Sequence, residues 1–307
     1  MKKKIKIGIP RAFLYYRHHI LWKNFFEKLN CQIVLSPDTN KEIIALGKDY
    51  SIDESCLSSK VYMGHVAYLI DKCDYVLIPR ISDYGKDEKV CIKFSGLYDI
   101  VKNTFPNLKI LNYNIEISTH HKEVYEFIKM GLKITKNPIK IILAYHHAHK
   151  KEKKYNQELM QCQANNLKNN KLKILIIAHP YNIYDKYIGY PITKFFKENN
   201  IDIIYADRLD KKIAIEYSKE LSETLYWTYS KEIIGAINYY QEAVDGIIFL
   251  TSFPCGPDSL VNELLIRKIK NIPITNIIID ESSAEAGLQT RLESFIDIIE
   301  GRKNNHE

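Results

Sequence analysis

Three of the six cysteines stand at the end of a predicted strand or the start of a predicted helix. Cys56 precedes a helical pattern, Cys91 lies in a loop that leads into another helix, and Cys255 follows a buried apolar run. A helix N-terminus lowers the pKa of a thiol and favours anionic ligands. Prolines on both sides of Cys255, together with Gly256, fix the direction of its thiolate and permit close approach of a bulky group. The three thiols therefore form a candidate cradle for a metal ion or a cluster.

Spacing alone favours another interpretation, in which these three cysteines are small buried hydrophobic residues. The sequence contains neither a Cys-x-x-Cys pair nor a standard zinc spacing. Three ligands would also leave the fourth position of a tetrahedron open to solvent or substrate. The remaining cysteines are interpreted as packing or chance residues: two adjoin the starts of predicted strands and one lies in a helix (Cys31, Cys73 and Cys162).

Short apolar runs that alternate with helical patterns position these cysteines and predict an α/β fold with parallel sheets. The predicted strands are residues 4–9, 32–35, 75–79, 108–112, 172–178, 201–205, 246–250 and 274–279. We expect two Rossmann-like lobes, joined by a helical connector, with a cleft between them. The predicted boundaries are 1–119 for the N-terminal lobe, 120–171 for the connector and 172–307 for the C-terminal lobe, which carries a helical insertion at about 211–242.

Polar residues gather where the predicted strands end, and ligands of open parallel sheets bind at those carboxyl ends. His179 directly follows a buried strand and can donate a hydrogen bond to a cluster sulfur or a substrate oxygen. Glu281 follows the last strand and can bring a carboxylate to the cleft. Both are predicted catalytic residues. The alternatives are turn and helix-capping roles for His179 and a pairing on a solvated helix face for Glu281.

The composition is that of an ordinary globular chain, with 307 residues, 46% hydrophobic and 26% charged. The formal net charge of +7 comes largely from basic runs that read as solvated faces, so nucleic acid is not an expected partner. A basic surface equally suits a phosphate-bearing or acidic partner. Without a secretory signal, a membrane span or a disulfide framework in the sequence, we expect a cytoplasmic protein that does not bind membranes.

Several motifs spread over nearly the whole chain carry a family resemblance. They are KIGIPRA (6–12), DESC (53–56), IPR (78–80), HPYNIYD (179–185), CGPDS (255–259) and EAGLQTRLE (285–293). Taken together, they resemble the acyl-CoA dehydratase activase-related proteins. Those proteins are relatives of the subunits of 2-hydroxyacyl-CoA dehydratase and benzoyl-CoA reductase.

The resemblance implies a 4Fe-4S cluster held in the cleft by Cys56, Cys91 and Cys255, with Ser55 and Gly256 as further cofactor-binding residues. In the dehydratase relatives, an ATP-driven activase injects one electron into such a cluster, and the electron passes to a thioester carbonyl to form a ketyl radical. This sequence has neither a glycine-rich phosphate loop nor a Walker signature, so ATP hydrolysis would belong to another polypeptide.

Three functions remain open from the sequence. The first is low-potential electron transfer to a thioester-like substrate or a partner subunit; as an enzyme, the protein would be a lyase or reductase of the 2-hydroxyacyl-CoA dehydratase type. The second is a non-catalytic, cluster-bearing partner of an ATP-dependent activase. The third is a metal-free α/β ligand-binding module. The resemblance names an activase and an acyl-CoA as partners, in an anaerobic setting, and leaves a homodimer or heterodimer open.

Overall fold

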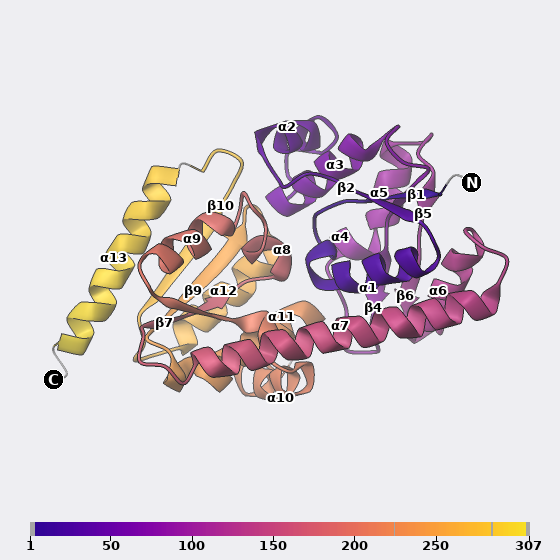
Figure 1. Cartoon of the computed structure of the whole chain (residues 1–307). Helices are drawn as coiled ribbons and strands as arrows, with labels where there is room; N and C mark the ends of the chain where they lie inside the picture. Colours follow the sequence, from indigo (N-terminus) through magenta and orange to yellow (C-terminus); the bar gives the residue numbers. More distant parts are fainter. Residues whose placement is uncertain (1–3, 224, 284, 305–307) are drawn as a thin grey trace. The chain divides into compact units, whose positions relative to one another are not determined.

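The chain is an α/β protein in which short parallel strands alternate with helices, as predicted (Figure 1). In this computed structural model the described residues are 4–223, 225–283 and 285–304. Two compact units divide the chain: unit 1 is Met1–Gln157 with Tyr226–Thr228, and unit 2 is Glu158–Leu225 with Tyr229–Glu307. Each unit contains one four-stranded parallel sheet, and each is described by itself below.

The sheet of unit 1 has the strand order β2-β1-β3-β5. These strands are β1 (Lys6–Ile9), β2 (Gln32–Leu35), β3 (Tyr75–Leu77) and β5 (Ile110–Leu111). The central strand β1 pairs with β2 on one side and β3 on the other, and Ile7 and Ile9 are buried there. Since each strand runs parallel to its neighbours, their carboxyl ends meet at one edge of the sheet.

Helices connect the strands of unit 1, in the order expected for parallel pairing. They are α1 (Tyr15–Lys28), α2 (Lys41–Asp49), α3 (Leu57–Leu69), α4 (Ile92–Ser95), α5 (Leu97–Thr104), α6 (Glu123–Leu132) and the first part of α7 (Pro138–Asn166), with the 3-10 turn η1 (Ile117–Thr119). Helix α7 begins at Pro138, where the missing N–H costs nothing.

A second, two-stranded sheet in unit 1 was not among the predicted strands. It pairs β4 (Arg80–Asp83) in parallel with β6 (Asn114–Glu116). Its buried Asp83 accepts hydrogen bonds from the backbone N–H and the hydroxyl of Ser118, at 3.0 and 2.5 Å. These bonds, with those from Lys89, hold the pKa of Asp83 below its usual value although burial raises it.

Two glycines let α2 and α3 touch backbone to backbone. A Cβ atom at Gly64 would lie 1.9 Å from the carbonyl oxygen of Ile43, and one at Gly47 would lie 1.9 Å from that of Lys60. Every residue from Leu57 to Val66 in α3 is buried, so this helix has no solvent-facing stripe over those turns. Close packing therefore fixes α3 and, with it, the residue that precedes the helix.

The sheet of unit 2 has the order β10-β9-β7-β8. Its strands are β7 (Lys173–Ile177), β8 (Asp202–Tyr205), β9 (Gly246–Ser252) and β10 (Ile274–Ile279). All residues of β7 and β9 are buried, as expected for central strands that are covered on both faces. The two edge strands, β8 and β10, are less completely buried.

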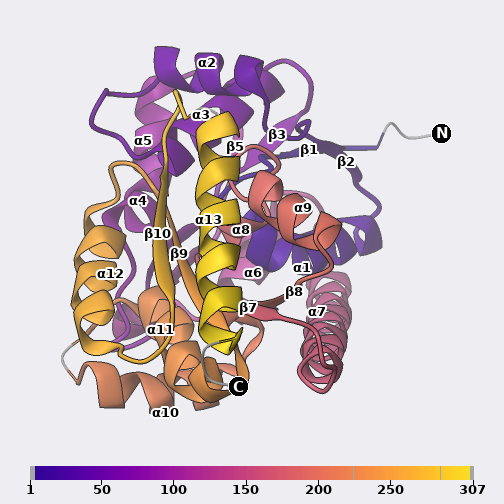
Figure 2. The same ribbon diagram turned by 90° about the vertical axis from the view of Figure 1, so that its left-hand side faces the viewer.

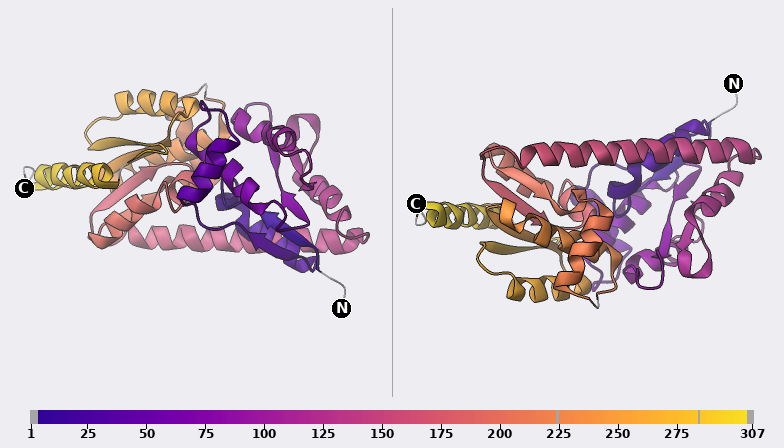
Figure 3. Two further views of the ribbon diagram at one scale, coloured as in Figure 1. Left: turned by 90° about the horizontal axis from the view of Figure 1, so that it is seen from above. Right: turned by 90° about the horizontal axis from the view of Figure 1, so that it is seen from below.

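Helices cover both faces of this sheet. They are α8 (Pro180–Ile183), α9 (Tyr190–Glu198), α10 (Lys211–Leu221), α11 (Thr228–Tyr240), α12 (Gly256–Lys268) and α13 (Glu285–Asn304), with the turns η2 (Ala206–Arg208) and η3 (Gln241–Ala243). Helices α9 and α13 lie together on one face, and α12 lies on the other (Figures 2 and 3). At Gly246 a side chain would collide with Phe295 and Ile299 of α13, which explains the glycine at the start of β9.

A side chain in the last part of α7 forms hydrogen bonds with the backbone at the outer edge of β8. The side-chain amide of Gln163 accepts a hydrogen bond from the N–H of Tyr205 at 2.8 Å and donates one to its carbonyl oxygen at 3.1 Å. The amide nitrogen of Gln163 also lies 3.2 Å from the hydroxyl of Tyr240. One buried side chain thus makes the bonds that a neighbouring strand would make at Tyr205.

Candidate functional site

Each of the three cysteines singled out from the sequence is the N-cap residue of a helix. Cys56 precedes α3, Cys91 precedes α4 and Cys255 precedes α12. Their side chains make no capping hydrogen bond, and all three are half-buried. Positive charge from the helix N-terminus favours a thiolate at such positions. The sequence placed these cysteines correctly at the starts of helices.

Within unit 1, the starts of α3 and α4 lie side by side. The ammonium group of Lys93 in α4 donates a hydrogen bond to the hydroxyl of Ser55 at 3.1 Å. Behind this contact, the ring of Phe13 stacks on Tyr62 of α3 at 5.2 Å and packs against Phe94 of α4 at 4.9 Å. Ser55 adjoins Cys56 and Lys93 follows Cys91 by two residues, so the two cysteine-bearing segments are neighbours.

The surroundings of Cys56 are polar and cationic although they are buried. Ser55, Ser58 and Lys60 are all nearly inaccessible to solvent. The backbone N–H groups of Ser59 and Lys60 both donate to the carbonyl oxygen of Cys56, which starts the helical ladder. Buried lysines are rare unless they serve an anion or a partner, so this region suits a negatively charged group.

In unit 2, Cys255 belongs to a buried chain of hydrogen bonds. The Nε2 atom of His179 lies 2.9 Å from a carboxylate oxygen of Asp258, and the thiol of Cys255 donates to the same carboxyl group. Burial raises the pKa of Asp258, but the charge and hydrogen bond of His179 and the bond from Cys255 outweigh it, so the pKa stays below its usual value. The Nδ1 atom of His179 is buried and has no hydrogen-bond partner among the described residues.

Sequence analysis did not single out Asp258 as a functional residue. Its partner His179 lies 79 residues away in the chain and follows a different strand, β7. Parallel order brings the carboxyl ends of β7 and β9 together, because these strands are direct neighbours in the sheet. The sequence does carry one signal for this role: Asp258 lies in the first turn of a helix, three residues after the candidate ligand Cys255.

Other side chains of the segment 179–185 reach the ends of neighbouring strands. Asn182 accepts a hydrogen bond from Ser252 at the end of β9, at 2.8 Å. Tyr184 donates to Asp207, which follows β8. Asp185 accepts from the backbone N–H groups of the turn that follows it. The segment therefore joins the carboxyl ends of β8 and β9 across the central strand β7.

Glu281 stands at the same edge of the unit 2 sheet. It follows β10 by two residues, and Ile279 at the end of β10 pairs with Ser252 at the end of β9. The backbone carbonyl of Glu281 accepts a hydrogen bond from the hydroxyl of Tyr187 at 3.5 Å. The side chain of Glu285, also part of the resemblance motifs, lies outside the described residues.

The remaining cysteines have different surroundings. Burial raises the pKa of Cys31 to about 11 and also raises the pKa of Cys73. The thiol of Cys73 donates to the carbonyl oxygen of Leu69 at 3.4 Å. Cys162 is exposed on α7. Raised pKa values oppose the thiolate form that binds metals, and neither Cys31 nor Cys73 is the N-cap residue of a helix.

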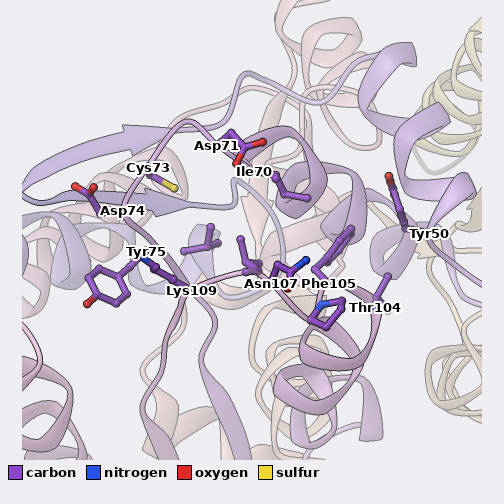
Figure 4. Close-up of a pocket in the computed structure, with 13 residues that line it drawn as sticks. Tyr50, Ile70, Asp71, Cys73, Asp74, Tyr75, Thr104, Phe105, Asn107 and Lys109 are labelled. Carbon is purple, nitrogen blue, oxygen red and sulfur yellow. The ribbon is translucent and has the colours of Figure 1, made fainter.

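A pocket of about 510 Å³ lies at the opposite edge of the unit 1 sheet, near the amino ends of β3 and β5 (Figure 4). Its lining includes Tyr50, Cys73, Asp74, Phe105 and Lys109. Asp74 already accepts a hydrogen bond from the backbone N–H of Lys6, at 2.7 Å. Neither Cys56 nor Cys91 lines this pocket.

Among the described residues, no group of three or more Cys, His, Asp and Glu side chains is placed to hold a metal ion. Cys56 and Cys91 belong to unit 1 and Cys255 to unit 2, and each unit is described by itself. A ligand set drawn from both units therefore stays a prediction. No helix in the described part of the chain has both the length and the apolar character to cross a membrane.

Comparison with protein families gives one match, over residues 6–209, to the family described as "CoA enzyme activase uncharacterised domain" (DUF2229). The match spans most of the chain. The chain belongs to this family. Membership confirms the resemblance to acyl-CoA dehydratase activase-related proteins that the sequence motifs carry. Cys56, Cys91 and His179 lie inside the matched residues, whereas Cys255 and Glu281 lie beyond them.

Among solved structures, the SBP FpvC from Pseudomonas aeruginosa in complex with Mn²⁺ is 10% identical, with 98% of this chain and 100% of that chain covered and a TM-score of 0.30. The corresponding values for ZnuA are 9% identity, 97% and 99% coverage, and a TM-score of 0.26. Similarity this low carries no argument about fold or function. A search of curated proteins gave no match.

Proposed function

We propose that the protein carries one 4Fe-4S cluster on Cys56, Cys91 and Cys255 and performs low-potential electron transfer, to a thioester-like substrate or to a partner protein. The family to which the chain belongs is described as a domain of CoA enzyme activases, and this description supports a role in electron transfer of that kind. An ATP-dependent activase on another polypeptide is the proposed electron donor.

One observation carries the proposal: the cysteines divide into two sets by environment. Three are half-buried N-cap residues of helices. The other three are either held with raised pKa values by burial or exposed on a long helix. Cysteines kept only as small hydrophobic residues would have no reason to occupy helix N-caps, where serine, threonine, aspartate and asparagine are preferred.

The donor set fits an iron–sulfur cluster. Cysteine thiolates are the usual ligands of 4Fe-4S clusters, and such a cluster supplies low-potential, one-electron chemistry. A Cβ atom at Gly256 would meet no atom within 4 Å, so there is open space directly beside Cys255. That space suits the close approach of a bulky group. With three protein ligands, the fourth iron position would be open to substrate, solvent or a partner's group.

Ligation would change the hydrogen bonding of Cys255. Its thiol donates a hydrogen bond to Asp258. Metal ligation requires the thiolate, so binding would release that proton. Asp258 would keep His179 as its partner and stay beside the bound sulfur. We assign Asp258 and His179 to positioning Cys255, and the unpartnered Nδ1 atom of His179 to hydrogen bonding with a bound group.

The proposal is tested by purifying the protein without oxygen and measuring iron and sulfide after reconstitution. We expect several iron atoms per chain and the absorption of a 4Fe-4S cluster. The triple variant Cys56→Ala, Cys91→Ala, Cys255→Ala should lose the iron, whereas Cys31→Ala, Cys73→Ala, Cys162→Ala should retain it. Less than about one iron per chain in the unaltered protein would instead favour a metal-free ligand-binding module.

A second measurement separates electron transfer to substrate from an accessory role. The reconstituted protein is mixed with an activase, ATP, a reductant and a 2-hydroxyacyl-CoA, and dehydration is followed. Product formation that depends on the three cysteines supports a lyase of the dehydratase type. Reduction of the cluster without product supports a non-catalytic, cluster-bearing partner of the activase.

A further inference from the structure

A basic pocket that no cysteine lines lies in unit 2. It has a volume of about 670 Å³ and runs between the edge strand β8 and helix α9. Its lining carries four cationic side chains and two carboxylates: Lys171, Lys194, Lys197 and Arg208, with Glu198 and Asp202. Four positive charges against two negative ones leave an excess of two. Such a lining attracts anions.

The carboxylates of the pocket neutralise only part of this charge. Lys171 lies 3.8 Å from Asp202, and Lys194 lies 3.8 Å from Glu198. Both pairs are long, and the second is exposed on both sides, so they are weak and easily exchanged for another anion. Among the described residues, Lys197 has no carboxylate within ion-pair distance, whereas Arg208 interacts electrostatically with the neighbouring Asp207.

Arg208 is held in place before any ligand binds. Its Nε atom donates to the hydroxyl oxygen of Tyr184 at 3.2 Å, and its guanidinium carbon lies 4.0 Å from the centre of the Tyr205 ring. Tyr184 in turn donates to the carboxylate of Asp207 at 3.0 Å. A hydrogen bond and a stacking contact together fix both the position and the plane of the guanidinium group.

The free edge of this guanidinium group is available for recognition. In the described part of the chain, Nε of Arg208 donates to Tyr184, and neither Nη atom donates a hydrogen bond. A fixed guanidinium plane presents parallel N–H donors that match two oxygens of one phosphoryl group. Because the side chain is already ordered, binding loses little rotamer entropy.

We propose that this pocket binds a phosphorylated small molecule, with one phosphoryl group on Arg208 and further negative charge toward Lys197. The volume is within the range of small-molecule sites and exceeds what one inorganic phosphate needs. The ligand is therefore expected to carry at least two phosphoryl groups. The site does not depend on the proposed cluster, because no cysteine lines it.

Calorimetric titration of the full-length protein with inorganic pyrophosphate and with ADP tests the proposal. Saturable binding of either probe is expected. Arg208→Gln should weaken it at least about tenfold, since hydrogen bonds to charged groups are lost. Arg208→Lys keeps the charge but not the paired donors, so it should also weaken binding. The control Lys219→Gln removes one exposed charge of unit 2 outside the pocket and should leave affinity unchanged.

Further outcomes assign the ligand or overturn the site. Equal affinity for both probes indicates recognition of the diphosphate alone, whereas tighter binding of ADP adds the nucleoside. Tyr184→Phe removes the hydrogen bond to Arg208 without changing charge, and weaker binding by this variant would show that the fixed orientation matters. Absence of saturable binding, or equal losses in Arg208→Gln and Lys219→Gln, would overturn the proposal. Circular dichroism of each variant checks folding.

Discussion

The helix that follows Cys56 and the helix that follows Cys255 are fixed in opposite ways. Helix α3 in unit 1 is held by close packing, with glycines that let its backbone touch that of α2. Helix α12 in unit 2 is held by polar pairs, through Asp258 and Asn262, while its outer face exposes Leu260 and Leu264. Close packing thus dominates at α3, whereas polar pairs add to the packing of Val261 and Leu265 at α12.

This contrast predicts different costs when each helix is altered. Packing contacts between backbones cannot relax, so a methyl group added to α3 should lower the free energy of unfolding strongly. Polar pairs in α12 can be replaced one at a time, and each loss costs the energy of a buried hydrogen bond. The following predictions test this difference, beginning with the largest effect.

Gly64→Ala should destabilise the protein by about 3 kcal/mol or more, because its methyl group would collide with the carbonyl oxygen of Ile43. Denaturant unfolding measures the change. Gly301→Ala in α13 is the matched control, since a Cβ atom there meets no atom within 4 Å. The control should stabilise slightly, as alanine is the better helix former. Similar stability of the two variants would show that α2 and α3 are not in rigid contact.

His65 makes the packed helix sensitive to pH. Burial, together with the charge of Arg11, lowers the pKa of His65 to about 3. Between pH 3 and the usual histidine value of about 6.5, the unfolded chain binds a proton that the folded chain does not. Stability should therefore fall by about 1.4 kcal/mol for each pH unit as the pH drops through that window.

His65→Gln can keep the hydrogen bond to Thr39 and does not titrate, so it should reduce this pH dependence. Unfolding measured at pH 7, 6, 5 and 4 makes the comparison. The exposed His147→Gln on α7 serves as the control and should leave the slope unchanged. An unchanged slope in His65→Gln would contradict the assignment.

Asn262→Ala should cost about 1–2 kcal/mol, because it leaves the buried hydroxyl of Thr251 without its 2.8 Å partner. Leu264→Ala on the exposed face of the same helix should change the free energy of unfolding by less than about 0.5 kcal/mol. Thermal and denaturant unfolding both measure the difference. A larger loss in Leu264→Ala would mean that packing and not polar pairing holds α12.

Asp258→Asn gives the smallest expected effect, and it depends on the proposed cluster. Removing a negative charge and adding an amide donor beside Cys255 should raise the reduction potential by on the order of tens of millivolts. Redox titration measures it. Asp297→Asn, on the exposed face of α13, should leave the potential unchanged. An unaltered reduction potential in Asp258→Asn would show that this carboxylate does not lie close to the cluster.

The main strands could be predicted because they are apolar runs of the right length. Residues 32–35 and 274–279 were predicted with the observed bounds of β2 and β10. The pair β4 and β6 could not be found in this way. Arg80–Asp83 and Asn114–Glu116 are short and polar, and their pairing depends on the buried contact of Asp83 with Ser118.

For the candidate site, the sequence indicated the positions but not the partners. Cysteine beside proline and glycine at a strand end marked the start of α12 correctly. The bond between His179 and Asp258 joins residues far apart in the chain and follows only from the order of the strands. Likewise, the contact of Gly47 and Gly64 with opposing carbonyls requires the three-dimensional packing of two helices. Neither leaves a local pattern.

The side-chain amide of Gln163, which hydrogen-bonds to the backbone of Tyr205, affects how readily the sheet of unit 2 can add a further strand. An outermost strand invites a foreign segment to extend the sheet, and such growth leads to fibrils and insoluble deposits. At Tyr205 the backbone N–H and carbonyl groups already bond to Gln163. A strand that added to this edge would therefore gain fewer hydrogen bonds. Replacing Gln163 would leave these two backbone groups of the edge strand unpaired and would favour self-association of the protein.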